Sequence, residues 1–154
     1  MFRRVALAAW AALTLIQAQS PSKPDFNGSW QMNSAKSDFG GGPVSERRVD
    51  KIALEGINFK DTMTQKLQRG AEATYDMIYT IDGKECTNRV RGNLVKSTAR
   101  WEGDVLVIDS TVFTLLKAHI EDRWSISPDG KVITVKRHLT GARNADQLVI
   151  LERQ

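Results

Sequence analysis

From residue 26 onward, polar and apolar residues alternate along most of the chain. The alternating stretches are rich in Val, Ile, Thr and aromatic residues, and turn sequences such as Asp82-Gly83 and Gly92-Asn93 interrupt them at spacings of roughly 8–14 residues. Alternation with a period of two is typical of β-strands that bury one face. The pattern predicts about ten strands, at residues 26–32, 47–55, 58–66, 73–80, 85–91, 94–101, 104–113, 118–126, 131–139 and 146–153.

Short strands joined by tight turns form an antiparallel meander, and a meander removes its unpaired edges by closing on itself. Beyond the N-terminal segment, no stretch shows the 3.6-residue periodicity of an amphipathic helix. We therefore expect an all-β fold, an antiparallel up-and-down meander of about 8–10 strands closed into a barrel. The one long connection, residues 33–45, contains Gly40-Gly41-Gly42-Pro43 and forms either a lid or plug or a plain connection.

Residues two apart in a strand share a face, so each predicted strand has one polar face and one mostly apolar face. The apolar face mixes aromatic, small and a few polar side chains, which is typical of a ligand pocket. The candidate ligand-binding residues on it are Phe59, Asp61, Met63, Tyr75, Met77, Tyr79, Ser97, Trp101, Asp122 and Trp124.

Two carboxylates in that set, Asp61 and Asp122, favour a cavity that holds water or a ligand. Burying a carboxylate without a partner costs several kcal/mol, so a packed core avoids it. Two alternatives remain open: the carboxylates pair with inward Arg or Lys near the barrel mouth, or a bulge reverses the alternation.

The N-terminal segment has the pattern of a signal peptide. Basic Met1-Phe2-Arg3-Arg4 precedes an apolar stretch from Val5 to Ile16, and Gln17-Ala18 offers a small-residue cleavage site. We predict a signal peptide at residues 1–18, cleavage near Ala18, and one barrel domain at residues 19–154. The protein is then exported, periplasmic or secreted, and an uncleaved amphipathic anchor is the alternative.

Charge and hydropathy limit the partners of the processed chain. Loss of Arg3 and Arg4 lowers the formal net charge from +4 to +2, and the basic residues are scattered instead of clustered. Nucleic acid is therefore not an expected partner. No membrane span is expected after residue 18, and the outward rows of Lys, Arg and Thr do not suit a lipid-facing barrel. We expect a monomer whose partner is a small hydrophobic molecule.

Chemistry that would indicate catalysis is missing from the sequence. The single cysteine, Cys86, forms no internal disulfide, and the two histidines, His119 and His138, lie in no spacing typical of a zinc site. No nucleophile elbow or phosphate-binding loop occurs. We expect no enzyme, no metal and no cofactor.

The two ends of the processed chain carry a resemblance to a known superfamily. The chain opens with Asp25-Phe26-Asn27-Gly28-Ser29-Trp30 and ends with Val149-Ile150-Leu151-Glu152-Arg153. This pattern resembles the calycins, which include lipocalins and fatty-acid-binding proteins. The D-F-x-G-x-W opening is also similar to that of small secreted bacterial proteins of unknown role.

The resemblance implies that Trp30 closes one end of the barrel and that Arg153 packs across its ring. Gly28 is then the residue that lets the backbone bend at this corner.

Two departures from the pattern of fatty-acid-binding proteins limit what the resemblance implies about a ligand. The 33–45 connection is too short and Gly-rich for the helical lid of fatty-acid-binding proteins. The last strand presents Val149 and Leu151 where that family presents Arg and Tyr to a carboxylate, so a fatty-acid ligand is not implied.

Three hypotheses about function follow. The first is an exported barrel that binds a small, mainly apolar ligand in its interior. The second is a structural or protein-interaction module whose barrel is a packed core. The third is an enzyme that uses Asp61 or Asp122 as an acid or base.

Overall fold

The computed structural model describes residues 22–141 and 143–154, and the predicted signal peptide lies outside them. Ten strands and one short 3-10 helix make up this part of the chain: β1 (Gly28–Met32), η1 (Ser34–Lys36), β2 (Ser45–Glu55), β3 (Asn58–Leu67), β4 (Ala73–Thr80), β5 (Glu85–Val90), β6 (Asn93–Glu102), β7 (Val105–Phe113), β8 (Ala118–Ile126), β9 (Val132–Gly141) and β10 (Ala145–Arg153). Each strand lies within a few residues of a predicted one, so the all-β prediction is confirmed.

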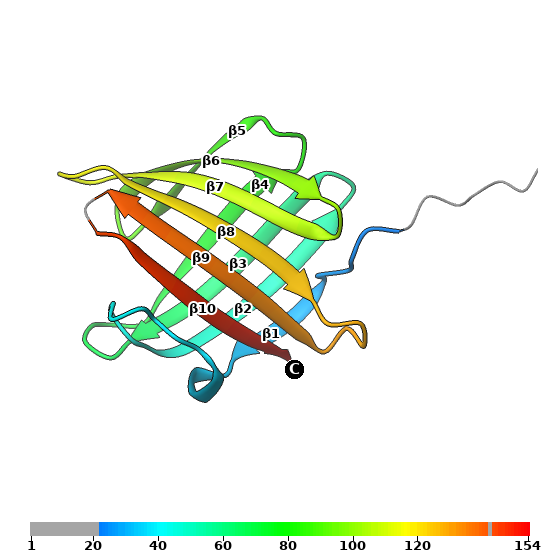
Figure 1. The fold of residues 1–154 in the computed structure, drawn as a ribbon, viewed down its shortest axis with the longest axis horizontal. Helices are drawn as coiled ribbons and strands as arrows, with labels where there is room; N and C mark the ends of the chain where they lie inside the picture. Colours follow the sequence, from blue (N-terminus) through cyan, green and yellow to red (C-terminus); the bar gives the residue numbers. More distant parts are fainter. Residues whose placement is uncertain (1–21, 142) are drawn as a thin grey trace, which may run out of the picture.

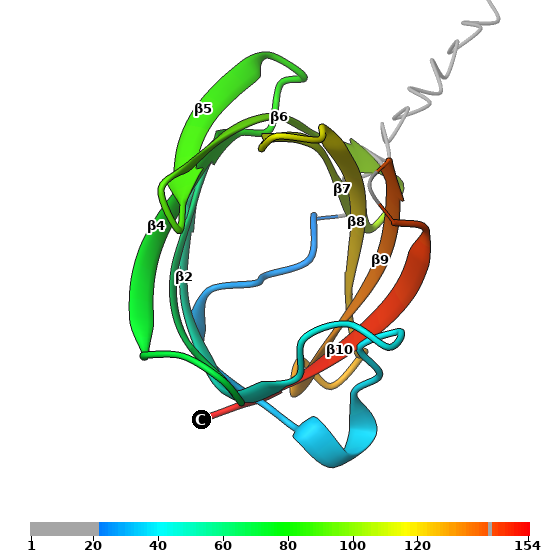
Figure 2. The same ribbon diagram turned by 90° about the vertical axis from the view of Figure 1, so that its left-hand side faces the viewer.

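The strands form one antiparallel sheet in the order β4-β3-β2-β1-β10-β9-β8-β7-β6-β5 (Figure 1). The first and last strands are therefore neighbours in the middle of the sheet, with Trp30 opposite Arg153. The sheet curls until its outer strands, β4 and β5, meet, which leaves an almost closed barrel (Figure 2). The predicted up-and-down barrel is confirmed.

Between β4 and β5 a side chain replaces the backbone ladder. The Asn88 amide donates from Nδ2 to the Ile78 carbonyl at 3.0 Å, and its Oδ1 accepts from the Ile78 N–H at 2.9 Å. Farther along the seam, Cys86 Sγ accepts a hydrogen bond from the Thr80 N–H at 3.3 Å. An inward-facing amide thus satisfies two backbone groups that have no strand partner.

One end of the barrel, which we call the closed end, is filled by aromatic and aliphatic side chains. The segment at residues 22–27 crosses it, seen at the far side of the barrel in Figure 2. Phe26, Trp30, Leu106, Ile133 and Leu151 are completely buried there. The Phe26 ring stacks on Trp101 and meets Trp124 edge-on. This end is a conventional packed core.

The contact predicted between Trp30 and Arg153 is present at the closed end. The Arg153 guanidinium carbon lies 4.2 Å from the centre of the indole, and Trp30 Nε1 donates to the Phe26 carbonyl at 2.9 Å. Gly28 has a φ of +128°, and a Cβ atom there would lie 2.7 Å from Arg153 Nη1. Only glycine therefore leaves room for the guanidinium.

The opposite end, which we call the open end, carries the β1–β2, β3–β4, β5–β6, β7–β8 and β9–β10 connections, and Figure 2 looks into it. The long β1–β2 connection lies against β10. Asp38 and Leu148 exchange two backbone hydrogen bonds of 2.7 Å, and Gln147 Nε2 donates to the Phe39 carbonyl at 2.9 Å. These bonds hold the connection against the rim of the barrel.

Candidate ligand site at the open end of the barrel

The middle of the barrel holds five charged residues, which we call the inner charged cluster: Arg48, Asp50, Asp61, Asp122 and Arg137. They come from β2, β3, β8 and β9, and strand alternation turns all of them inward. Two carboxylates are paired. Arg48 donates to Asp50 from Nε and Nη2 at 2.8 and 2.7 Å, and Arg137 donates to Asp122 from the same two atoms at 2.7 Å each.

Asp61 is the third carboxyl of the cluster, and it lacks such a pair. Its side chain is buried, and its Oδ1 atom has no hydrogen-bond partner among the described residues. Burial raises the pKa of Asp61 well above its usual range, and the neighbouring Asp50 carboxylate raises it further against the opposing effect of Arg48. The raised pKa favours the protonated form of Asp61, in which the cluster has two negative and two positive charges.

A cavity of about 280 Å³ lies between this cluster and the open end. Met32, Leu139 and Val149 contribute apolar wall from three strands, and Phe39 contributes an aromatic ring from the β1–β2 connection. Arg48 and Arg137 line the cavity as well. The remaining lining residues are Pro43, Ser45, Gln65, Leu67, Arg143 and Gln147. The site is a chamber lined about equally by apolar and polar side chains, and its polar part includes the guanidinium groups of Arg48, Arg137 and Arg143.

The β1–β2 connection forms part of this chamber. Phe39 packs against the hydrophobic core, and Gly40 (φ +55°) lies so close to β10 that a Cβ atom would approach the Asp146 carbonyl oxygen to 2.2 Å. The connection is therefore more than a link between strands, because it supplies wall to the cavity. Of the two possibilities left open by the sequence, the structure favours a partial plug.

None of the ten candidate ligand-binding residues lines this cavity. Phe59, Tyr79 and Trp124 are buried in the hydrophobic core, and Met77 and Trp101 pack against it. Asp61 and Asp122 belong to the inner charged cluster, while Ser97 is buried and bonds Ser110 at 2.8 Å. Met63 and Tyr75 are half-buried on the inward faces of β3 and β4. The prediction that they face inward fits the strand register, and their contact with a ligand stays a prediction.

Three buried polar atoms of the interior have no protein partner among the described residues: Asp61 Oδ1, Tyr75 Oη and Trp124 Nε1. Each such atom costs about 1–3 kcal/mol when nothing pairs with it. They favour an interior that accommodates a polar atom of water or of a ligand. Asp122, in contrast, follows the alternative of pairing with an inward arginine.

Sequence reasoning missed Arg48, Asp50 and Arg137. A signal was available, because Arg137 shares its strand face with Ile133, Val135 and Leu139, which are apolar. An arginine in an apolar row predicts a buried ion pair. Its partner, Asp122, follows only from the register of β8 against β9.

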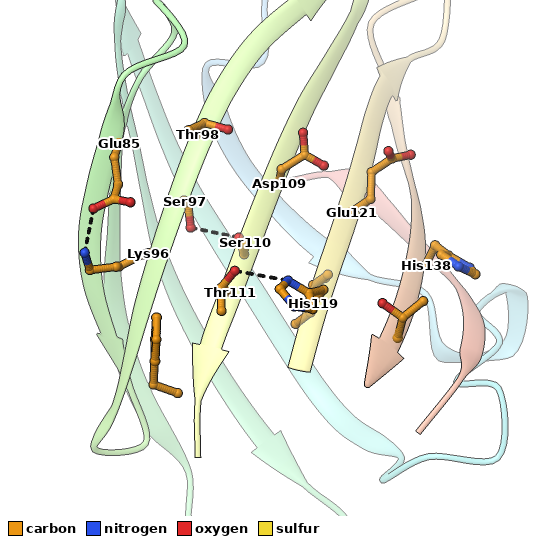
Figure 3. A pocket seen from close by; sticks show the side chains of 13 residues that line it. Glu85, Lys96, Ser97, Thr98, Asp109, Ser110, Thr111, His119, Glu121 and His138 are labelled. Atoms are coloured by element: carbon orange, nitrogen blue, oxygen red, sulfur yellow. Dashed lines mark hydrogen bonds and ion pairs between the residues drawn. The ribbon is translucent and has the colours of Figure 1, made fainter. Parts of the chain in front are cut away.

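A second hollow, of about 340 Å³, lies along β5 to β9 and is lined mainly by outward-facing polar side chains (Figure 3). Its groups bond one another: Lys96 Nζ donates to Glu85 at 2.8 Å, and the Thr111 hydroxyl lies 3.1 Å from His119 Nδ1.

The described residues contain no group of three or more His, Cys, Asp or Glu arranged to hold a metal ion. Within residues 22–141 and 143–154, no helix has the length and apolar character to cross a membrane.

The fold is an up-and-down β-barrel similar to that of fatty-acid-binding proteins, one of the groups that the two ends of the sequence resemble. The chain is similar to secretory abundant heat soluble protein 4 from Ramazzottius varieornatus, with 12% sequence identity and a TM-score of 0.62 over 89% of this chain and 99% of that chain. It is also similar to Echinococcus granulosus fatty-acid-binding protein 1, with 15% identity and a TM-score of 0.55 over 83% and 96%. A third likeness is to a Schistosoma mansoni fatty-acid-binding protein in complex with arachidonic acid, with 14% identity and a TM-score of 0.52 over 84% and 96%.

At these identities the likeness shows the fold alone. No protein-family model matches the chain, and no curated protein matches it by sequence.

Proposed function

We propose that the protein is an exported, monomeric barrel that binds a small, mainly apolar molecule in the cavity at its open end. The cavity carries this proposal, because apolar side chains form about half of its lining and polar side chains there offer hydrogen bonds to a polar end of the guest. Its volume of about 280 Å³ is near the roughly 300 Å³ lower bound of known ligand sites, so the guest is small.

The polar groups of the site favour a guest without a net charge. The ion pairs occupy Nε and Nη2 of both Arg48 and Arg137, which leaves Nη1 of each guanidinium outside those bonds. The raised pKa of Asp61 favours its neutral form, in which the positive and negative charges of the inner charged cluster balance. A hydroxyl or carbonyl oxygen accepts a hydrogen bond from the guanidinium groups without the cost of burying a charge, and the third arginine of the lining, Arg143, lies exposed in the β9–β10 connection.

Straight-chain alcohols, carboxylates and amines of equal, medium length test this selectivity. We expect the alcohol to raise the thermal unfolding midpoint and to appear bound in native mass spectra, and the two charged analogues to bind more weakly. Val149→Phe narrows the cavity and should remove the shift. Ile150→Phe, on the opposite face of the same strand, should keep it. If no analogue binds, or if Val149→Phe binds as well as the unaltered protein, the proposal is wrong.

A packed structural or interaction module is the second candidate. The observations in its favour are the fully packed closed end and a cavity slightly below the usual volume of ligand sites. It predicts that no alcohol of the series raises the unfolding midpoint, and that Val149→Phe lowers the stability of the protein because it overpacks such an interior. The enzyme hypothesis has less support, because Asp122 is bound to Arg137 through both oxygens and Asp61 lies outside the cavity lining.

Export is the remaining part of the proposal, and it rests on residues 1–18. N-terminal sequencing of the protein from the extracytoplasmic fraction should begin at Gln19. A first residue of Met1 there would show that the segment is retained as an anchor.

A further inference from the structure

Two neighbouring leucines at the open end are exposed to water. The β7–β8 connection, residues 114–117, extends beyond its neighbours at the left of Figure 1 and carries Leu115 and Leu116. Leu115 is completely exposed, and 65% of Leu116 is exposed. A pair of neighbouring exposed leucines at the tip of a turn is unfavourable in water unless another surface covers it.

Basic side chains accompany these leucines at the same end. The five open-end connections contain Lys36, Arg69, Arg91, Lys117 and Arg143, against Asp38 and Glu72. Lys36 pairs with Glu152, and Glu72 pairs with Arg47. The other four cations form no ion pair within the described residues, and all four are exposed.

Two of these four cations also lie beside aromatic rings near the rim. Lys117 Nζ is 5.5 Å from the centre of the Phe113 ring, and the Arg91 guanidinium carbon is 5.6 Å from that of Tyr75. The nearest acidic groups on the strands are Glu46, paired with Lys66, and Asp146, which bonds His138. The open end therefore presents exposed leucines within a net positive rim.

The closed end has a different character. Its turns and flanking segment contain Lys23, Lys84 and Lys131 against Asp25, Asp82, Asp104 and Asp129. One exposed aliphatic residue, Ile57, lies in the β2–β3 turn with 51% of its surface exposed. Among residues 22–141 and 143–154, the combination of two adjacent exposed leucines and an excess of basic residues thus occurs only at the end that opens into the cavity.

We propose that the open end docks onto an anionic lipid surface. Leu115 and Leu116 enter the boundary between headgroups and acyl chains, and Arg69, Arg91, Lys117 and Arg143 lie beside the lipid phosphates. Charge complementarity selects this partner, because apolar side chains combined with unpaired cations match a surface that is apolar below and negative above. Docking in this orientation places the mouth of the cavity at the membrane. The inference goes beyond the proposed ligand binding and does not depend on it.

Vesicle co-sedimentation without any added ligand tests the docking. The processed chain, residues 19–154, contains every strand of the barrel and is the form to use. We expect it to bind vesicles of phosphatidylcholine with about one third phosphatidylglycerol, to bind pure phosphatidylcholine vesicles far less, and to dissociate as salt increases. The double variant Leu115→Ser/Leu116→Ser should lower the partition coefficient about tenfold or more.

Ile57→Ser is the control, because it removes an exposed aliphatic residue from the closed end; its partition coefficient should equal that of the unaltered protein. Arg69→Gln/Arg91→Gln should reduce binding to anionic vesicles and flatten its salt dependence. Denaturation midpoints verify that the variants remain folded. The proposal is overturned if anionic vesicles leave the protein in solution, or if the double leucine variant binds like the unaltered chain. Self-association that the leucine variant abolishes, without any binding to vesicles, would identify a second copy of the chain as the occupant.

Discussion

At the scale of single residues, Asp61 links the interior of the barrel to pH. Its pKa is raised in the folded protein, so folding favours its protonated form. Below the pKa of an unfolded Asp, near 4, Asp61 is protonated in both the folded and the unfolded protein, and its ionisation costs no stability. As the pH rises from there toward the higher pKa of the folded protein, the unfolded chain ionises more readily, so the free energy of unfolding falls. The loss amounts to at most about 1.4 kcal/mol per pH unit.

We therefore predict that Asp61→Asn stabilises the protein relative to the unaltered chain, by an amount that increases as the pH rises above about 4. Urea denaturation at several pH values measures the difference. Asp76→Asn, on the neighbouring strand, is the control of opposite sign, because hydrogen bonds from Thr62 and Lys60 lower the pKa of the exposed Asp76. A difference for Asp61→Asn that does not change with pH would mean that Asp61 has an ordinary pKa.

The closed end depends on a second pair of residues, Trp30 and Arg153. Trp30→Ala should lower the free energy of unfolding by about 3–5 kcal/mol, the usual effect of truncating a buried aromatic residue. Arg153→Ala removes the stacking on Trp30 and the hydrogen bonds to the Gly130 and Asn27 carbonyls. Because the guanidinium is exposed, we expect a smaller loss in the free energy of unfolding, about 1–2 kcal/mol.

A double-mutant cycle in urea separates the contact between these two residues from their other interactions. If Trp30 and Arg153 stabilise the closed end together, the double variant loses less stability than the two single variants combined. Strictly additive losses would contradict that view.

At the scale of strands, the seam between β4 and β5 is the weakest part of the barrel wall. Asn88→Leu keeps the side-chain volume near its original value but leaves the Ile78 N–H and carbonyl without the amide that now pairs them. We predict a loss of about 1–3 kcal/mol in local stability. Hydrogen exchange should show it as faster exchange at Ile78.

Thr87→Leu, on the outward face next to Asn88, is the control for this seam and should leave the exchange of Ile78 unchanged. If both variants speed the exchange of Ile78 equally, a leucine at either position in β5 destabilises the seam, and the amide of Asn88 has no special role.

At the scale of the whole molecule, strand positions and their closure into a barrel were predictable because each depends on local alternation and turn residues. The Trp30–Arg153 contact was predictable from motifs at the two ends of the chain. The cavity was not, because its position depends on how far the β1–β2 connection folds over the rim, and that follows from contacts of Phe39, Gly40 and Gln147 with distant strands.

The inner charged cluster shows a second limit of sequence reasoning. Asp61 and Asp122 are equivalent in the sequence, since each is a carboxylate on an otherwise apolar face. They differ in the folded protein, because register brings Arg137 opposite Asp122, while Arg48 is already bound to Asp50. The partner of each buried carboxylate therefore depends on the register between neighbouring strands, which the sequence of one strand does not determine.

The pairing of β1 with β10 also determines when the protein can fold. Arg153 bonds the Asn27 carbonyl across a separation of 126 residues, so the closed end forms only after the last strand is available. Closing a loop of this length delays folding, and topologies dominated by distant contacts fold slowly. During that delay the barrel remains unclosed. For the export that we propose, the delay is an advantage, because an unclosed barrel can still be threaded through a narrow channel.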